Sequence, residues 1–352
     1  MYKYVLPFIC MCLLHLCTIV AQEAASSFRI AELNCENLFD TLHDEGFQDK
    51  EFLPSSERKW TSRRYRRKLL MLSKEIASIS PTTPPDVIAL IEVENDTVLR
   101  DLTQRTPLRS LRYKYVMTHS DDPRGIDVAL LYQEGGFRPL RTATVNWSHR
   151  LNLPKLRTRD LLHVRGLAKS GDTIDIIVHH APSRLGGRKA QKLRNDISKS
   201  LRAYVDSIYT ANTTANIIII GDFNDTPTSR STKTCLNAVV YDHEDPPKLT
   251  DILPDQLYYL ANKPKAENGV KASYRYRGHW EMLDQCIVNG NLLLPSNHIH
   301  VKNSTLRIVS HQFLLVPDKT YGNFTPWRTY QGPLYKGGFS DHLPIILELQ
   351  YK

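Results

Sequence analysis

IIIIGDFN, residues 217–224, is the stretch from which the fold and the site of this 352-residue chain can be inferred. Its four isoleucines predict a short buried β-strand. Gly221 permits a tight turn where that strand ends. Asp222 and Asn224 are two residues apart, so their side chains share one face if the backbone stays extended. The alternative is an ordinary turn, because Asp, Asn and Gly all favour turns.

Polar side chains also stand where other predicted strands end. Asn34 ends the apolar run IAELN, and Glu92 ends VIALIE. The pair His179-His180 ends IDIIVHH. An unpaired carboxylate is costly inside a strand, but strand ends that open at one edge can bring such groups together around a hard cation. Mg²⁺ prefers oxygen ligands and keeps several waters, so one or two carboxylates suffice to hold it.

A second chemical signal is GGFSDHLP, residues 337–344, directly before the last predicted strand. Its adjacent Asp341 and His342 suit a metal contact and a proton-handling or charge-stabilising group. Asp284 stands at a strand start in WEMLDQ, residues 280–285, where it can orient the His342 ring by accepting its N–H. A lone histidine is more often a structural residue, but the motif that contains Asp284 favours a functional site for His342.

Together these motifs resemble the endonuclease/exonuclease/phosphatase superfamily, which includes pancreatic deoxyribonuclease, abasic-site endonucleases, neutral sphingomyelinases and inositol-phosphate phosphatases. The resemblance implies an α/β (α+β) four-layer sandwich, with two packed mixed β-sheets flanked by helices. RGIDVALLY at 124–132 and RTYQGPLYKGG at 328–338 look most like exported bacterial members. The motifs, in chain order, are LNCENLFD with Asn34, LIEVEN with Glu92, HHAPS at 179–183, GDFN at 221–224, LDQ at 283–285 and SDH at 340–342.

The resemblance implies a phosphoric ester hydrolase that uses Mg²⁺ or Mn²⁺. Glu92 would be the principal metal ligand. Asn34 would support the same ion or a phosphate oxygen, and Asp341 would sit near the metal. A bound metal lowers the pKa of water and neutralises charge that builds on the phosphoryl oxygens, which agrees with the chemistry of these side chains.

The resemblance also implies catalytic roles for four further residues. Asp222 would orient and activate the attacking water, and Asn224 would help to hold the phosphate. Asp284 would pair with His342, which would contact the phosphoryl oxygens.

The tandem histidines leave one assignment open. Both His179 and His180 are candidate catalytic residues, and the sequence does not say which ring faces the phosphate. The expected substrate contacts are Arg124, Ser183 and Trp280.

Further apolar runs predict strands, and two apolar stripes predict helices. In the helix expected at 61–79, Thr61 or Ser62 can act as the cap. A second helix is expected at 189–209. Strands interleaved with helices indicate one domain over residues 22–352. The expected strands are 29–33, 87–93, 127–132, 174–179, 216–220, 285–288 and 345–349.

The charge of the chain favours a polyanionic partner. The formal net charge is +9, and such a surplus suits nucleic acid without identifying it. We therefore expect a nuclease-type phosphodiesterase, with a phospholipid or inositol-phosphate phosphoesterase as the alternative. A binding protein with a decayed site is disfavoured, because every motif retains suitable side chains. The helix at 61–79 begins with a basic face that either tracks phosphates or is merely solvated: Arg58, Lys59, Arg63, Arg64, Arg66, Arg67 and Lys68.

Residues 1–21 have the plan of a secretory signal peptide, with Lys3 before an apolar stretch that is short for a membrane span. We therefore expect an exported protein, periplasmic or secreted, with no integral membrane segment after processing. Its expected state is a monomer. Three cysteines would remain, namely Cys35, Cys235 and Cys286. Their small, odd number predicts no disulfide framework, and Cys35 and Cys286 are expected to be buried free thiols because they lie inside apolar runs.

Overall fold

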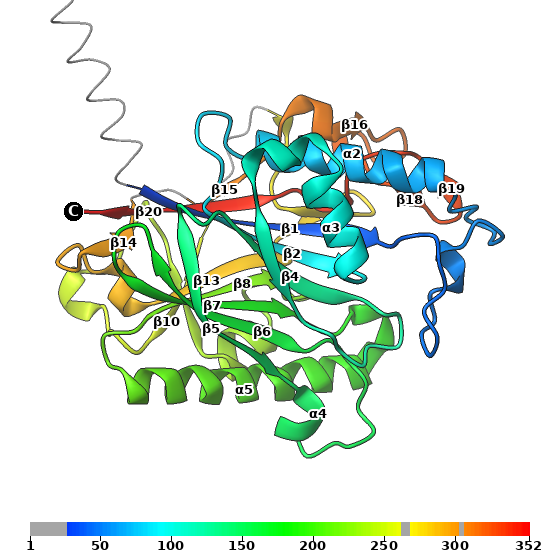
Figure 1. Ribbon diagram of the computed structural model, residues 1–352. Coiled ribbons are helices and arrows are strands. Elements are labelled where there is room, and N and C mark those ends of the chain that lie inside the picture. The colour runs from blue at the N-terminus through cyan, green and yellow to red at the C-terminus, as the bar shows by residue number, and fades with distance from the viewer. Residues whose placement is uncertain (1–26, 262–267, 303–305) are drawn as a thin grey trace, which may run out of the picture.

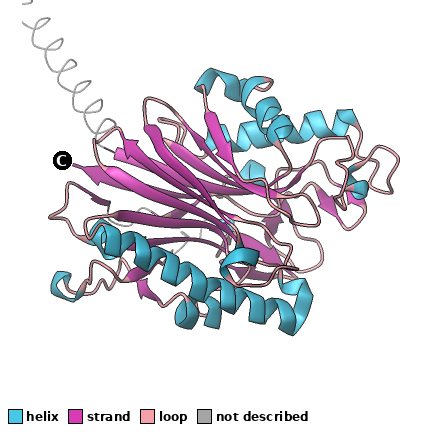
Figure 2. Ribbon diagram, turned by 60° about the horizontal axis from the view of Figure 1, so that its bottom comes forward, coloured by secondary structure: helices cyan, strands magenta, loops and turns pink. Residues whose placement is uncertain are grey.

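The computed structural model describes residues 27–261, 268–302 and 306–352, and its centre is a pair of seven-stranded mixed β-sheets (Figure 1). Helices cover the outer faces, so the layers run helix, sheet, sheet, helix (Figure 2). The predicted fold class, an α/β sandwich of two mixed sheets flanked by helices, is confirmed. The expected signal peptide at 1–21 lies outside the described residues.

The first sheet carries Asn34 and Glu92. Its strands are β1 (Ser27–Leu38), β2 (Val87–Val93), β3 (Lys114–Met117), β4 (Asp127–Tyr132), β14 (Ile299–Val301), β15 (Arg307–Ile308) and β20 (Ile345–Tyr351). They lie in the order β14-β20-β1-β2-β4-β3, with β15 paired to β20. β1 is parallel to β2 and antiparallel to β20, so the first and last strands of the sheet meet at its centre.

The second sheet is built around the strand that ends at Asp222. Its strands are β5 (Phe137–Val145), β6 (Leu161–Ala168), β7 (Thr173–His180), β8 (Asn216–Asp222), β9 (Ala238–Tyr241), β10 (Leu257–Leu260) and β13 (Asp284–Asn289). Their order is β5-β6-β7-β8-β13-β10-β9. β7 and β8 are parallel, whereas β8 and β13 are antiparallel.

Alternation along β8 explains why four consecutive isoleucines are needed. Ile218 and Ile220 lie in the core between the two sheets. Ile217 and Ile219 lie in the outer core, under α5 (Gly187–Ala211). All four side chains are fully buried, and burial of each contributes about 1.5–3 kcal/mol. The strand is therefore apolar on both faces and becomes polar only at Asp222.

Two helices cover the first sheet, α2 (Ser62–Ser78) and α3 (Asp96–Gln104). α2 confirms the helix expected at 61–79, and Leu69, Leu72 and Ile76 pack into the outer core. Thr61 is its N-cap residue, and no side-chain bond is made by that cap. Asn95 caps α3 by accepting two backbone N–H groups.

Lys68 differs from its predicted place on the basic face of the helix. It is 1% exposed, and its ammonium donates to Thr329 Oγ1 at 2.7 Å and to the Phe339 carbonyl at 2.5 Å. The reason is helical spacing, because Lys68 follows buried Tyr65 by three residues and stands beside Leu69. The exposed basic face therefore keeps the arginines and loses this lysine.

The remaining α-helix and strands are short. They are α4 (Trp147–Arg150) and three hairpins: β11 (Tyr274–Tyr276) with β12 (His279–Glu281), β16 (Leu315–Pro317) with β17 (Phe324–Pro326), and β18 (Tyr330–Gln331) with β19 (Leu334–Tyr335). Within the described part of the chain, no helix has both the length and the apolar composition that a membrane span requires.

Candidate active site

One end of the second sheet brings three polar side chains side by side. His180 on β7 pairs with Asp222 on β8, and Asp222 pairs with Asp284 on β13. Gly221 has a φ of 146°, and a Cβ on it would lie 1.9 Å from the carbonyl oxygen of His179. Only glycine tolerates this approach. Gly221 therefore lets the two strands stay paired up to the residues of the site.

The two adjacent histidines point to opposite faces of β7, as successive strand residues do. His180 Nε2 lies 3.8 Å from Asp222 Oδ2 and 4.0 Å from Glu92 Oε1. His179 packs edge-on against Trp147, in the outer core. His180 lies in the site, and the expectation that His179 might act there is corrected.

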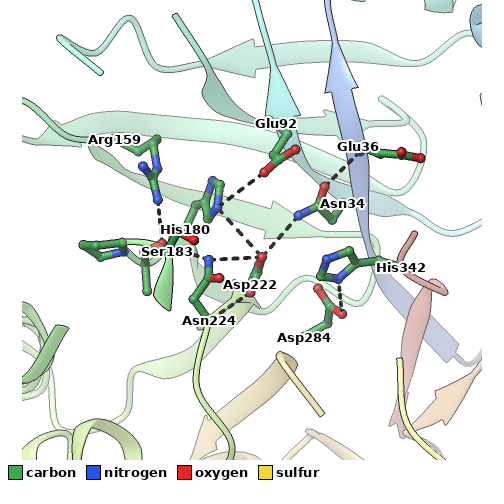
Figure 3. Close-up of polar contacts among 12 residues, drawn as sticks. Asn34, Glu36, Glu92, Arg159, His180, Ser183, Asp222, Asn224, Asp284 and His342 are labelled. Atoms are coloured by element: carbon green, nitrogen blue, oxygen red, sulfur yellow. Dashed lines mark hydrogen bonds and ion pairs between the residues drawn. The ribbon is translucent and has the colours of Figure 1, made fainter. Parts of the chain in front are cut away.

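Amide groups hold Asp222 in one orientation (Figure 3). Its Oδ1 accepts the backbone N–H of Asn224 at 2.7 Å. Its Oδ2 accepts the side-chain amides of Asn34 at 3.2 Å and Asn224 at 3.3 Å. The Asn224 amide also donates to the Ala181 carbonyl at 3.0 Å, from a backbone with a φ of 47°. Asp222 and Asn224 thus face the same site, as their spacing predicts.

Asp284 and His342 form a buried pair. His342 Nδ1 lies 2.7 Å from Asp284 Oδ2, which is the hydrogen bond expected from the sequence. Asp284 is fully buried and His342 is 6% exposed. The Tyr274 ring lies against the imidazole, with 4.7 Å between centroids. Because Nδ1 is bonded to Asp284, Nε2 is the nitrogen that remains for a substrate.

Glu92 projects from an irregular point in β2. The strand register shifts between Ile91 and Val93, and Glu92 has a φ of 63°. Left-handed backbone is rare for residues other than glycine, and such bulges re-aim side chains at functional sites. Glu92 Oε2 accepts the N–H of Asn37 at 2.9 Å, and Oε1 lies 3.6 Å from Arg124 Nη2.

Asn34 joins this side of the site to the loop at 340–342. Its Oδ1 accepts the N–H of Glu36 at 2.9 Å. Its carbonyl accepts the Ser340 hydroxyl at 2.6 Å, and the same hydroxyl accepts the N–H of His342 at 3.2 Å. The strand that carries Asn34 therefore sets the position of the loop that carries His342.

Burial shifts most of the pKa values in the site. It raises the pKa of Asp222 to about 7, against the lowering effect of His342. Burial, with Asp284 nearby, raises the pKa of Glu32 well above its usual value, and burial lowers that of His180 well below it. Burial also lowers the pKa of His342, but the Asp284 carboxylate outweighs it and holds the pKa well above its usual value. At neutral pH an imidazolium at His342 therefore faces a neutral His180.

The oxygen-rich side chains fit a hard divalent cation. Glu92 and Asn34 present carboxylate and amide oxygens, which such ions prefer. Besides burial, the nearby carboxylates of Asp284 and Glu92 raise the pKa of Asp222. A cation bound among these carboxylates would offset their mutual repulsion. Asp222, Asp284 and His342 also place one ligand atom each within 4.8 Å of one another. The hydrogen bond between Asp284 and His342 accounts for that grouping without an ion.

The β11–β12 hairpin does not bring Trp280 to the site. Trp280 pairs in register with Arg275, and its ring lies 5.7 Å below that guanidinium and against the outer core. Alternation places Tyr274 on the opposite face, which is the face that meets His342. The expectation that Trp280 contacts substrate is therefore corrected, and Tyr274 is the aromatic residue beside the pair formed by Asp284 and His342.

The other predicted residues lie around the site. Arg124 is 40% exposed beside Glu92. Ser183 is partly exposed, and its hydroxyl accepts the N–H of Leu185 at 3.4 Å. Asp341 Oδ2 accepts the guanidinium of Arg328 at 2.6 Å.

Sequence reasoning did not find three buried ionisable groups of the site. Arg159 donates to Asp122 at 2.8 Å and to the Ala181 carbonyl at 2.6 Å. Glu36 is 8% exposed beside Asn34. Glu32 is fully buried, and neither of its carboxylate oxygens has a hydrogen-bond partner among the described residues. The only available signal was spacing, because Glu32 is two residues before Asn34 and shares its strand face.

Comparisons with known proteins agree with this geometry. Residues 29–351 match the family model described as Endonuclease/Exonuclease/phosphatase family. An endonuclease/exonuclease/phosphatase family protein from Bacteroides thetaiotaomicron is 13% identical with a TM-score of 0.54, over 93% of this chain and 96% of that one. A humanized D. rerio TDP2 is 14% identical with a TM-score of 0.55, over 92% and 99%. The mannosyl-6-phosphatase Bt3783 from B. thetaiotaomicron is 14% identical with a TM-score of 0.53, over 92% and 100%. No curated protein matches the chain.

Proposed function

The chain belongs to the endonuclease/exonuclease/phosphatase family, and we propose that it is a divalent-metal-dependent phosphodiesterase that hydrolyses nucleic acid. Family membership carries the coarser statement, that the protein is a phosphoesterase. One observation carries the proposal of a working hydrolase. Asp222 and Asp284 from one sheet converge with Asn34 from the other sheet and with His342 on the loop before β20, and hydrogen bonds link Asn34 to Asp222 and His342 to Asp284.

The side chains divide the work of phosphate-ester hydrolysis. Glu92 and Asn34 would hold the divalent ion, which when bound neutralises phosphate charge and lowers the pKa of coordinated water. Asp222, with a pKa of about 7, accepts a proton from the attacking water. The His342 imidazolium stabilises negative charge on the phosphoryl oxygens, and Asp284 keeps its ring oriented.

Two other groups contact the same phosphate in this proposal. His180 is neutral at neutral pH because burial lowers its pKa, so its Nε2 donates a hydrogen bond and adds no charge. Arg124, beside Glu92 and 40% exposed, offers a guanidinium to a non-bridging oxygen.

The nucleic-acid assignment is supported by where the basic start of α2 lies. Arg63, Arg66 and Arg67 are exposed. Arg67 donates to the Gly337 carbonyl at 3.0 Å, so this basic face borders the segment that leads into the loop with His342. A polyanion that enters the site could run along these guanidiniums. The fold itself does not choose, because the similar structures include a sugar phosphatase by name.

A substrate panel tests the proposal directly. Purified protein with Mg²⁺ would be offered plasmid DNA, single-stranded DNA, RNA, sphingomyelin and inositol phosphates. We expect cleavage of nucleic acid and its loss in excess chelator. Turnover of only the lipid or the inositol phosphates would replace the nucleic-acid assignment with the second class. Full activity in chelator would refute the metal dependence.

The basic face is tested by charge reversal of Arg63, Arg66 and Arg67 to Glu. If these residues meet phosphates, nucleic-acid affinity falls and the slope of its salt dependence becomes shallower by roughly one unit per lost contact. Hydrolysis of a small model phosphodiester should stay the same. Unchanged affinity and salt slope would show that the arginines only solvate the helix.

A matched control reverses three exposed basic residues on the opposite outer side of the sandwich. Arg138 and Arg141 lie on the edge strand β5, and Lys199 lies on α5. This variant has the same net charge as the α2 variant, so it separates the position of the charge from its amount. Its affinity should fall by far less.

We also propose that the protein is exported, because residues 1–21 have the plan of a signal peptide. N-terminal sequencing of the protein from its native cells should find Gln22 as the first residue. An intact Met1 in the purified protein would refute export by this route.

A further inference from the structure

One guanidinium in the site lies between two carboxylates. Arg328 Nη2 donates to Asp341 Oδ2 at 2.6 Å, and Arg328 Nε lies 3.6 Å from Glu36 Oε1. Asp341 immediately precedes the catalytic His342, and Glu36 follows the metal-side residue Asn34 by two positions. The guanidinium therefore carries a fixed positive charge between the catalytic loop and the metal-side strand.

Two backbone hydrogen bonds fix the Glu36 carboxylate in place beside Arg328. Glu36 Oε2 accepts the N–H of Thr329 at 2.5 Å, and Oε1 accepts that of Tyr330 at 3.1 Å. The backbone of Glu36 is also left-handed, with a φ of 48°. Lys68 supports the same segment from beneath by donating to the Thr329 hydroxyl at 2.7 Å. These contacts thus hold the Glu36 carboxylate in place beside the guanidinium.

A second divalent ion would compete for the same two carboxylates. Two-metal phosphoesterase sites hold their ions about 3.5–4 Å apart, and each ion needs its own oxygen ligands. On this chain the first ion is expected at Glu92 and Asn34. Glu36, whose N–H donates to Asn34 Oδ1, and Asp341 are two further acidic residues near Asn34 and His342, and both carboxylates already face Arg328.

We propose that Arg328 is a built-in cation that replaces a second divalent ion at Glu36 and Asp341, so that the site binds one divalent ion. The inference rests on the proposed metal dependence. Arginine suits this role because its guanidinium stays charged at every working pH and can contact two carboxylates at once. The Arg328 guanidinium would also neutralise the Asp341 carboxylate next to the bound phosphate when no second ion is present.

Mn²⁺ is the probe for the test, because the electron paramagnetic resonance of free Mn²⁺ counts bound ions without any activity measurement. Wild type should bind one ion. Arg328→Met removes the charge and keeps the chain length, so the released carboxylates should take up a second ion. Arg328→Lys restores the charge and should return the count to one.

A matched control is Arg165→Met. Arg165 makes a two-bond contact to Asp175 at 2.9 Å and is 35% exposed, close to the 37% of Arg328, but its pair lies on β6 and β7 in contact with α5. Its Mn²⁺ count should stay at one.

Different failures have different meanings. Two ions on wild type, or one ion on folded Arg328→Met, would overturn the role of Arg328 and leave the metal dependence standing. No ion on folded wild type would refute the metal dependence itself. If Arg328→Met does not fold, the counts for wild type and Arg328→Lys still decide, because the proposal requires one ion on each.

Discussion

The pair formed by Asp284 and His342 should behave as one catalytic unit. We would substitute Asp284→Asn, His342→Ala and both together. Asparagine keeps the size of the side chain and removes the charge that holds the imidazole as a cation. Each single change therefore removes the oriented imidazolium, by different routes.

The size of the loss follows from the geometry of the pair. His342 Nδ1 lies 2.7 Å from Asp284 Oδ2, and the side chains of His342 and Asp284 are 7% and 0% exposed. Breaking a buried charged pair costs about 3–5 kcal/mol, which corresponds to roughly two to four orders of magnitude in turnover if the cost falls on the transition state. Independent residues would multiply these losses. Residues that act as a unit lose little more in the double variant.

Turnover of a chromogenic model phosphodiester with saturating Mg²⁺ is the assay, normalised to folded protein by circular dichroism. His163 and Asp175 form a matched control pair on β6 and β7, 2.8 Å apart with side chains 11% and 1% exposed. His163→Ala should lower stability and leave turnover per folded molecule unchanged. Losses in the Asp284 and His342 variants that simply multiply would refute the proposed unit.

Three further outcomes are expected. Glu92→Gln should remove most of the activity and weaken Mn²⁺ binding by at least about tenfold, because a neutral amide replaces the main hard-ion ligand; unchanged Mn²⁺ affinity would contradict this. Burial raises the pKa of Glu75 from 4.5 to about 8, so the folded chain keeps a proton that the unfolded chain loses, and stability falls as pH rises between these values. Glu75→Gln should flatten that fall in Tm, and an unaltered pH profile would contradict the assignment. Reductant should not change Tm, because Cys35, Cys235 and Cys286 are buried free thiols; a large drop would reveal a disulfide.

The sequence was informative about the fold wherever strands are apolar on both faces. The predicted strands at 87–93 and 127–132 match the structure to the residue, because nearly every side chain in them is buried. β6 was missed because it alternates, with His163 and Arg165 between apolar residues. Those two side chains pair with Asp175 on the next strand, which local sequence cannot show.

The sequence predicts which residues form the site better than it predicts the directions in which their side chains point. The motifs predict Asp222, Asp284 and His342 in one site, and the structure brings these side chains together, because each stands at a strand end or on the loop before a strand. Which of two adjacent histidines faces inward depends on strand register, and register is set by partners far along the chain. The contact of Arg328 with Glu36 is likewise a tertiary fact, which no spacing rule contains.

The division of the site between the two sheets has a consequence for how activity arises during folding. Asn34 and Glu92 belong to one sheet, whereas His180 and Asp222 belong to the other, and the two sheets pack together through a shared apolar core. A compact intermediate with both sheets formed but not yet tightly docked would keep its secondary structure and have no aligned catalytic groups. In refolding experiments, recovery of hydrolysis should therefore lag behind recovery of far-ultraviolet circular dichroism. Hydrolytic activity would therefore measure the tertiary docking of the two sheets.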